Sequence, residues 1–170
     1  MLIRFLTASD ALPYRELMLE AYVQAADAFT STAGERATEP ESWGVKRIAH
    51  PHGLSAAFGE VEDTETLGTV ALEYSAKTKT KHSALLIGMY VREQARGIGI
   101  GKSLLAAAIE HVRARQGTEV ITLTVTEGNE PDIRLYEAAG FQAWGTEPMA
   151  IATPGGYKGK VHMWRPASFP

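Results

Sequence analysis

The segment that most constrains the fold is residues 84–105, where the apolar run "ALLIGMYV" leads through "REQARGIGIG" into "KSLL". The apolar run predicts a buried strand, and the apolar stripe that continues to Val112 predicts a helix. Between them glycines alternate with isoleucines, so the backbone of the turn carries little side-chain bulk. A bare turn that opens a helix gathers N–H groups at the positive end of the helix dipole, which suits an anionic phosphate group.

The spacing of these glycines distinguishes between known phosphate loops. A Walker A loop needs a glycine where this chain has Arg96, five residues before Gly101. The dinucleotide fingerprint Gly-x-Gly-x-x-Gly fails from both Gly97 and Gly99. The pattern that fits is Arg-x-x-Gly-x-Gly, ending at Gly101. A tight strand-to-helix turn is the alternative, but three glycines at alternate positions exceed what a turn needs, so we favour a phosphate-binding loop.

The rest of the 170-residue chain alternates between strand and helix patterns without a repeat or a linker, which predicts one domain over residues 1–170. Apolar and β-branched runs predict strands at 2–6, 54–61, 66–74, 119–125, 141–152 and 157–165. The strands at 54–61 and 66–74 are predicted to form an antiparallel hairpin. Apolar stripes predict helices at 11–28, capped by Asp10, at 40–50 and at 131–139. Residues 30–40 are polar and predict a loop.

The composition excludes several classes of function. The net charge of −3 gives no electrostatic footprint for nucleic acid. The chain has no cysteine, so disulfides, zinc–thiolate sites and cysteine nucleophiles are excluded. No apolar run approaches the ~20 residues of a membrane helix, and the N-terminus does not read as a signal peptide. We therefore expect a cytoplasmic protein that binds neither a membrane nor nucleic acid.

A second motif lies downstream, in "TVTEGNEPDIRLYEAAGF", where the informative positions are Asn129, Leu135, Tyr136, Gly140 and Phe141. Together with the strand and the arginine–glycine loop, this motif makes residues 85–141 resemble the GNAT N-acetyltransferase superfamily. The resemblance implies an α/β (α+β) fold: a mixed, mostly antiparallel sheet with helices on both faces. Strands 84–91 and 119–125 would be a parallel pair that splays apart around the cofactor.

The resemblance also implies acetyl-CoA as co-substrate and transfer of its acetyl group to a primary amine. We expect no metal, and the absence of cysteine favours direct transfer in a ternary complex over a cysteine acyl-enzyme. Tyr136 would protonate the leaving thiolate, and Asn129 would hydrogen-bond the pantetheine arm. The pantetheine would also pair with the backbone of Met89, Tyr90 and Val91. The pyrophosphate would lie against Arg96, Gly97, Ile98, Gly99, Ile100, Gly101 and Lys102. Acceptor contacts are implied at Phe29, Thr30, Ser31 and Glu35, where a mobile polar loop is the equal alternative.

This chain departs from the family pattern at three places. Glu93 stands where the family often has proline, Asp132 stands where it usually has alanine, and the strand before the loop lacks the glutamate that many members use as a base. Glu73 and His82 are the candidate bases, but each fits a solvated surface residue better. Gly88, inside the strand, marks either a β-bulge or room for a packed helix.

Several alternatives stay open. Tyr136 also fits a core tyrosine on a helix stripe, although the flanking motif favours the catalytic role. The chain as a whole also fits a non-catalytic acyl-CoA-binding module. The acceptor is a small amine, an amino acid or antibiotic, or a protein amine, and a homodimer is left open. The basic run of Lys77, Lys79 and Lys81 predicts a solvated connection.

Overall fold

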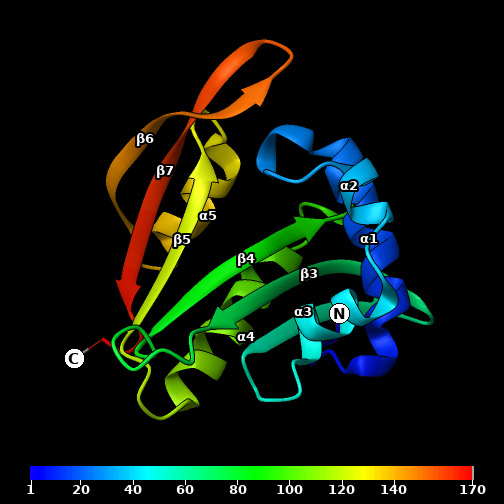
Figure 1. Ribbon diagram of the computed structural model, residues 1–170, viewed down its shortest axis with the longest axis horizontal. Coiled ribbons are helices and arrows are strands. Elements are labelled where there is room, and N and C mark those ends of the chain that lie inside the picture. The colour runs from blue at the N-terminus through cyan, green and yellow to red at the C-terminus, as the bar shows by residue number, and fades with distance from the viewer. Residues whose placement is uncertain (170) are drawn as a thin grey trace.

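The computed structural model describes residues 1–169, in which seven strands form one sheet in the order β1-β2-β3-β4-β5-β7-β6 (Figure 1). Neighbouring strands are antiparallel except for β4 and β5, which are parallel. The predicted mixed, mostly antiparallel sheet is therefore confirmed. The strands are β1 (Ile3–Phe5), β2 (Ser55–Glu62), β3 (Glu65–Tyr74), β4 (Ser83–Val91), β5 (Val120–Thr126), β6 (Gln142–Thr153) and β7 (Gly156–Pro166).

Helices cover both faces of the sheet, as predicted (Figure 1). On one face, α1 (Ala11–Gln24) and α3 (Glu41–Ala49) bury a cluster that includes Leu17 and Ala71. On the other face, α4 (Ile100–Ala114) and α5 (Glu130–Ala138) bury a cluster that includes Leu104 and Leu72. The short helical segments are α2 (Ala33–Ala37) and the 3-10 turns η1 (Ala8–Asp10), η2 (Ala26–Ala28) and η3 (Glu93–Ala95). Within residues 1–169, no helix is both long and apolar enough to span a membrane.

Two predicted elements near the N-terminus were wrong in part. The helix predicted for 11–28 ends at Gln24, and η2 follows it. Residues 30–40, predicted to be a loop, contain α2 because Thr32 and Glu35 form a reciprocal capping box. The Thr32 hydroxyl accepts from the Glu35 N–H at 3.2 Å, and the Glu35 carboxylate accepts from the Thr32 N–H at 2.8 Å.

Asp10 is the N-cap residue of α1, as predicted, but its carboxylate makes no capping hydrogen bond to that helix. The carboxylate accepts hydrogen bonds from the Arg4 guanidinium at 2.6 and 2.9 Å and from the Thr7 N–H at 2.8 Å. These bonds tie the end of β1 to the start of the helical region, and they hold the pKa of Asp10 down at about 2.

The parallel strands β4 and β5 separate soon after they meet, as predicted. Within residues 1–169 they pair only from Ser83–Val120 to Leu85–Thr122, and beyond that point each pairs only with its antiparallel neighbour. Figure 1 shows the two strands meeting near the C-terminus and then diverging, β4 toward α1 and α2 and β5 alongside β7. Because a ladder is missing on this side of β4, its backbone groups are available to a ligand there.

A β-bulge lies on β4 where the cleft begins. The β3–β4 register jumps from Ala71–Ile87 to Thr69–Tyr90, and Gly88 adopts a positive φ of 61°. This conformation suits glycine and strains other residues. The hydroxyl of Tyr14 lies 3.7 Å from the position that a Cβ on Gly88 would occupy. Of the two predicted roles for Gly88, the structure therefore supports the bulge.

Candidate functional site

Two adjoining cavities occupy the cleft between β4 and β5. The loop cavity, of about 470 Å³, runs along the glycine loop and the end of β4. The strand cavity, of about 300 Å³, lies deeper between the two strands and reaches the α1–α3 side. The cavities share five lining residues, which are Ala28, Phe29, Met89, Asn129 and Asp132. One continuous cleft thus connects the glycine loop to the splayed strands.

The glycine loop presents free N–H groups to the loop cavity. Gly99 is the N-cap of α4 with a φ of 92°, and Gly97 has a φ of 82°. Among residues 1–169, no heavy atom beyond the adjacent residues lies within 4 Å of where a Cβ would stand on either glycine. The N–H groups of a helix's first turn have no partner within the helix, and here they lie at its positive end. This geometry fits an anionic pyrophosphate.

The structure brings most of the predicted cofactor residues to this cavity. Its lining includes Met89, Tyr90, Val91, Arg96, Gly97, Gly99, Ile100, Gly101, Lys102 and Asn129. Ile98 does not line it, and its side chain points to solvent with 68% exposure. The Tyr90 side chain packs in the core on the α1–α3 side and donates to the Glu20 carboxylate at 3.2 Å. Burial raises the pKa of Tyr90, and its backbone is the part suited to a ligand.

The start of α5 carries a short polar network at the junction of the two cavities. The Asn129 side-chain amide donates to the Asp132 carboxylate at 2.8 Å. Burial raises the pKa of Asp132, and the hydrogen bond from Asn129 acts in the opposite direction. Asp132, which departs from the family pattern, therefore occupies part of Asn129's donor capacity.

Tyr136 lines the strand cavity from α5 and is 5% exposed. Its ring packs against Phe141 with the centroids 6.0 Å apart, in an edge-to-face arrangement. Burial, followed by the nearby Asp132, raises the pKa of the Tyr136 hydroxyl above its usual value. The hydroxyl therefore keeps its proton at neutral pH, as a proton donor requires. Tyr136 is also part of the core, as the alternative role predicted, and its catalytic role stays a prediction.

Two of the four predicted acceptor residues reach the strand cavity. Phe29 and Thr30 line it, whereas Ser31 and Glu35 do not. The Glu35 carboxylate is used in the α2 capping box, and its hydrogen bonds with Thr32 lower its pKa. The segment before Phe29 is tied across the cleft mouth, because the Asp27 carbonyl accepts from the Thr126 hydroxyl at 2.6 Å.

Neither candidate base lines the cleft. Glu73 on β3 forms a 2.6 Å ion pair with Arg47 of α3. The carbonyl of His82 accepts from the N–H groups of Glu119 and Val120, at the end of β4 where the strands still pair. Lys77–Lys81 form an exposed turn near the same end. Within residues 1–169, no group of three His, Asp or Glu side chains is placed to hold a metal.

Two cations of the strand cavity, Arg47 on α3 and Lys160 on β7, were missed by the sequence reasoning. They belong to elements far apart in the chain and to no motif. Trp43 lies one turn before Arg47, and the Arg47 guanidinium lies 5.6 Å from the centre of its ring. The guanidinium of Arg36 lies 4.3 Å from the same ring. Trp43 therefore contacts both arginines and helps to orient Arg47.

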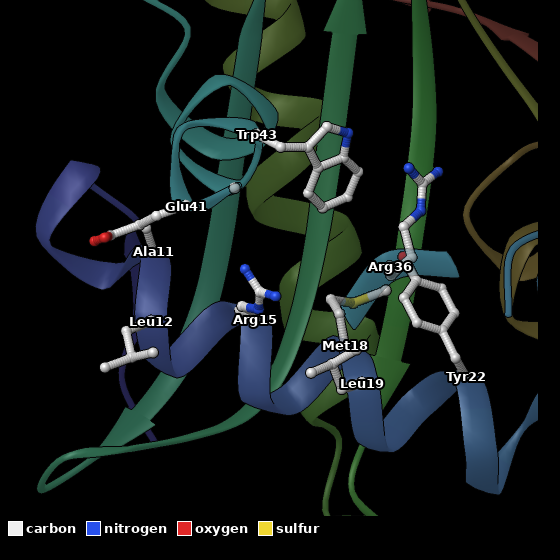
Figure 2. Close-up of a pocket in the computed structure, with 10 residues that line it drawn as sticks. Ala11, Leu12, Arg15, Met18, Leu19, Tyr22, Arg36, Glu41 and Trp43 are labelled. Atoms are coloured by element: carbon white, nitrogen blue, oxygen red, sulfur yellow. The ribbon is translucent and has the colours of Figure 1, made fainter. Parts of the chain in front are cut away.

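A separate small cavity, of about 180 Å³, lies between α1 and α3. Figure 2 shows Arg15, Met18 and Tyr22 rising from α1 toward Trp43 of α3. The Arg15 guanidinium donates to the carbonyls of Ala37 and Glu39, which fastens the segment after α2 to α1. This cavity does not share a lining residue with the cleft, so its observed role is to pack the wall that carries Arg47.

Comparison with known proteins identifies the family. A family model described as "Acetyltransferase (GNAT) family" matches residues 17–141. The mycothiol acetyltransferase of Salinispora arenicola is 43% identical over 54 residues, which are 32% of this chain and 18% of that protein. The L-methionine sulfoximine/L-methionine sulfone acetyltransferase of Pseudomonas aeruginosa is 42% identical over 60 residues, 35% of this chain and 34% of that protein. These matches thus span about a fifth to a third of the relatives.

The fold is also found in solved structures over the whole chain. A putative acetyltransferase from Salmonella typhimurium, solved with its cofactor acetyl-CoA, superposes with a TM-score of 0.81 at 20% identity. The superposition covers 100% of this chain and 95% of that one. At this identity the likeness establishes the shared fold.

Proposed function

The chain belongs to the acetyltransferase (GNAT) family, and we propose that it transfers an acetyl group from acetyl-CoA to a primary amine. The transfer is direct, within a ternary complex of protein, acetyl-CoA and amine. The observation that carries this proposal is the continuous cleft in which the bare N-terminus of α4 leads to the separated edges of β4 and β5.

The residues present fit acetyl-CoA at each part of the molecule. The N–H groups at the start of α4 would hold the pyrophosphate. The β4 backbone beyond Leu85 has no strand partner on the β5 side within residues 1–169, so it would pair with the amides of the pantetheine arm. Met89 and Tyr136 both line the strand cavity, which would receive the thioester.

The proposed chemistry needs one proton removed and one proton supplied. A free alkylamine has a pKa of about 10.4, so the acceptor must lose a proton before its nitrogen attacks the thioester carbon. The sequence of β4 contains no carboxylate, and Glu73 is held by Arg47, so we propose that water takes the proton. A β4 N–H would stabilise the developing oxyanion. As the carbon–sulfur bond breaks, Tyr136 would give its proton to the thiolate and regain one from solvent.

Thiol release measured with acetyl-CoA across a panel of amines tests the proposal. We expect turnover with at least one amine and tight binding of CoA, with no competition from ATP. Tight binding of CoA without turnover of any amine class would support the non-catalytic acyl-CoA-binding module instead. Failure to bind CoA would refute the family-based function altogether.

Three wider proposals accompany this function. Residues 1–170 act as one domain, since the single sheet supplies both walls of the cleft. The protein is cytoplasmic, where acetyl-CoA is available.

The homodimer forms through β6, whose edge position and exposed Trp144 and Met149 suit contact with a second copy. Light scattering of Trp144→Glu against the unaltered protein tests the dimer, which should dissociate.

A further inference from the structure

The proposed transfer gives no role to the two cationic side chains that line the strand cavity, Arg47 and Lys160. They enter from opposite sides of the molecule, Arg47 from α3 and Lys160 from β7. Among residues 1–169, the only carboxylate that lines the same cavity is Asp132, which is engaged by Asn129 and whose pKa is raised by burial. Arg47 is paired with Glu73, which does not line this cavity, so among residues 1–169 Lys160 is the cation of the cavity that no carboxylate contacts.

Arg47 is held in place but only partly satisfied. Its side chain is 21% exposed, and one Nη1 N–H donates to Glu73 at 2.6 Å. Its Nε is shielded from solvent and has no hydrogen-bond partner among residues 1–169. A guanidinium offers five N–H donors, so several remain for a ligand. The bidentate geometry of these donors matches a carboxylate.

Lys160 is an uncompensated cation at the facing wall. Within residues 1–169, no carboxylate oxygen lies within 4.0 Å of its ammonium nitrogen. Lys158, two residues earlier on the same strand, forms a 2.9 Å ion pair with Asp27 and lies outside the strand cavity. Of these two lysines, the one that faces the cavity is thus the one without a partner.

We propose that the acceptor is an amine that also carries a free carboxylate, an amino acid or a close analogue, and that Arg47 and Lys160 bind this carboxylate. This inference rests on the proposed acetyl transfer and names its substrate class. Phe29, Leu85 and Ile87 also line this cavity, so apolar side chains are available to contact the group between amine and carboxylate. A lysine side chain within a protein carries no such carboxylate.

Matched pairs of acceptors, each an amino acid and its carboxamide, test the inference through kcat/KM for thiol release. The unaltered protein should prefer the acid, because a charge-assisted hydrogen bond is lost with the amide. In Lys160→Met and Arg47→Gln, KM for the acid should rise ~10- to 100-fold, while KM for the amide and for acetyl-CoA should change little. The quantity to compare is the ratio of kcat/KM for the acid to kcat/KM for the amide, in each variant and in the unaltered protein. The two acceptors differ in amine pKa, and this difference cancels when the ratios are compared between proteins.

Two control variants separate carboxylate binding from a structural role. Glu73→Gln breaks the Arg47 ion pair but leaves the guanidinium charge, so the preference for the acid should be kept or increased. Lys79→Met removes the same charge as Lys160→Met from an exposed turn outside the cleft and should leave the preference unchanged. An unchanged acid-to-amide preference in Arg47→Gln would make Arg47 a structural residue and overturn its part in binding.

If simple amines and carboxamides are acetylated as well as the acids, the carboxylate site is refuted and the acetyltransferase proposal stands. If no acceptor turns over, calorimetry of the acid panel on the CoA-loaded protein decides. Binding that is lost in Lys160→Met supports the site, and the absence of binding refutes it.

Discussion

The Nε of Arg96 donates a hydrogen bond to the carbonyl oxygen of Val91 at 2.9 Å, which ties the glycine loop back to the last residue of β4. The Arg96 guanidinium also lies 5.7 Å from the centre of the Tyr90 ring. Arg96, the first residue of the Arg-x-x-Gly-x-Gly pattern, therefore helps to fix the conformation of the glycine loop. This contact joins the two parts of the cleft that would hold the pyrophosphate and the pantetheine arm.

We expect Arg96→Ala to weaken CoA binding by about 5- to 20-fold, because both a positive charge and a loop-shaping hydrogen bond are lost. Calorimetric titration with CoA measures the effect. Arg113→Ala is the matched control, since Arg113 pairs with Glu110 on the exposed side of α4 and should not affect binding. Equal affinities for both variants would show that Arg96 contributes neither charge nor loop shape to the cofactor site.

A second prediction compares two glycines with similar backbones. Gly99 has a φ of 92° and Gly117 has a φ of 83°, and among residues 1–169 both have open space within 4 Å of where a Cβ would stand. Valine at either position should cost roughly 1–2 kcal/mol of folding free energy through backbone strain. Only Gly99→Val should abolish CoA binding, because of these two glycines only Gly99 lines the loop cavity. Urea unfolding and CoA calorimetry on both variants separate strain from ligand contact. Normal CoA binding by folded Gly99→Val would remove the glycine loop from the phosphate site.

The local motifs of this chain were predictable because their residues are adjacent in sequence. Gly97 and Gly99 could be placed in a turn because an apolar strand precedes them and a helix follows them in the sequence. Tyr136 could be placed on a helix because a helical pattern follows Asn129. The capping box of Thr32 and Glu35 could also have been recognised from their spacing. The polar composition of residues 30–40 instead led to the prediction of a loop, and α2 was missed. Arg47 and Lys160 could not be found from sequence, because the sheet order alone brings α3 and β7 to one cavity.

A third prediction concerns the pH dependence of stability. Hydrogen bonds from Arg4 and Thr7 lower the pKa of Asp10 from 3.8 to about 2 in the folded protein. The depressed pKa means that this contribution is present above the unfolded pKa and is lost as pH falls toward 2. Asp10→Asn should therefore reduce the free energy of unfolding at pH 7 by about 1–2 kcal/mol, discounted because Arg4 is partly exposed. The difference between the proteins should shrink at pH 3 and vanish only below about pH 2. Urea unfolding at these pH values checks it, and a deficit that is independent of pH would contradict the ionic origin.

The hydroxyl of Tyr136 is the group on which the proposed chemistry depends most. It lines the strand cavity from a 5% exposed side chain, and burial raises its pKa. The raised pKa keeps the proton on the oxygen until the pH exceeds the ordinary tyrosine value of about 10. The rate should accordingly rise with pH as the acceptor amine loses its proton, with no alkaline decline from Tyr136 below about pH 10.

Tyr136→Phe keeps the ring and its packing against Phe141 and removes only the hydroxyl. If that hydroxyl protonates the leaving thiolate, kcat should fall ~10²–10⁴-fold, while CoA affinity measured by calorimetry should change little. The fall should appear equally in kcat/KM, because the interaction is made only in the transition state. A thioester analogue whose leaving thiol is more acidic should react in the variant with a smaller deficit, since its thiolate needs less help from a proton donor. A raised KM for acetyl-CoA with kcat intact would make Tyr136 a binding residue, and unchanged kinetics in a folded variant would leave it as a core tyrosine alone.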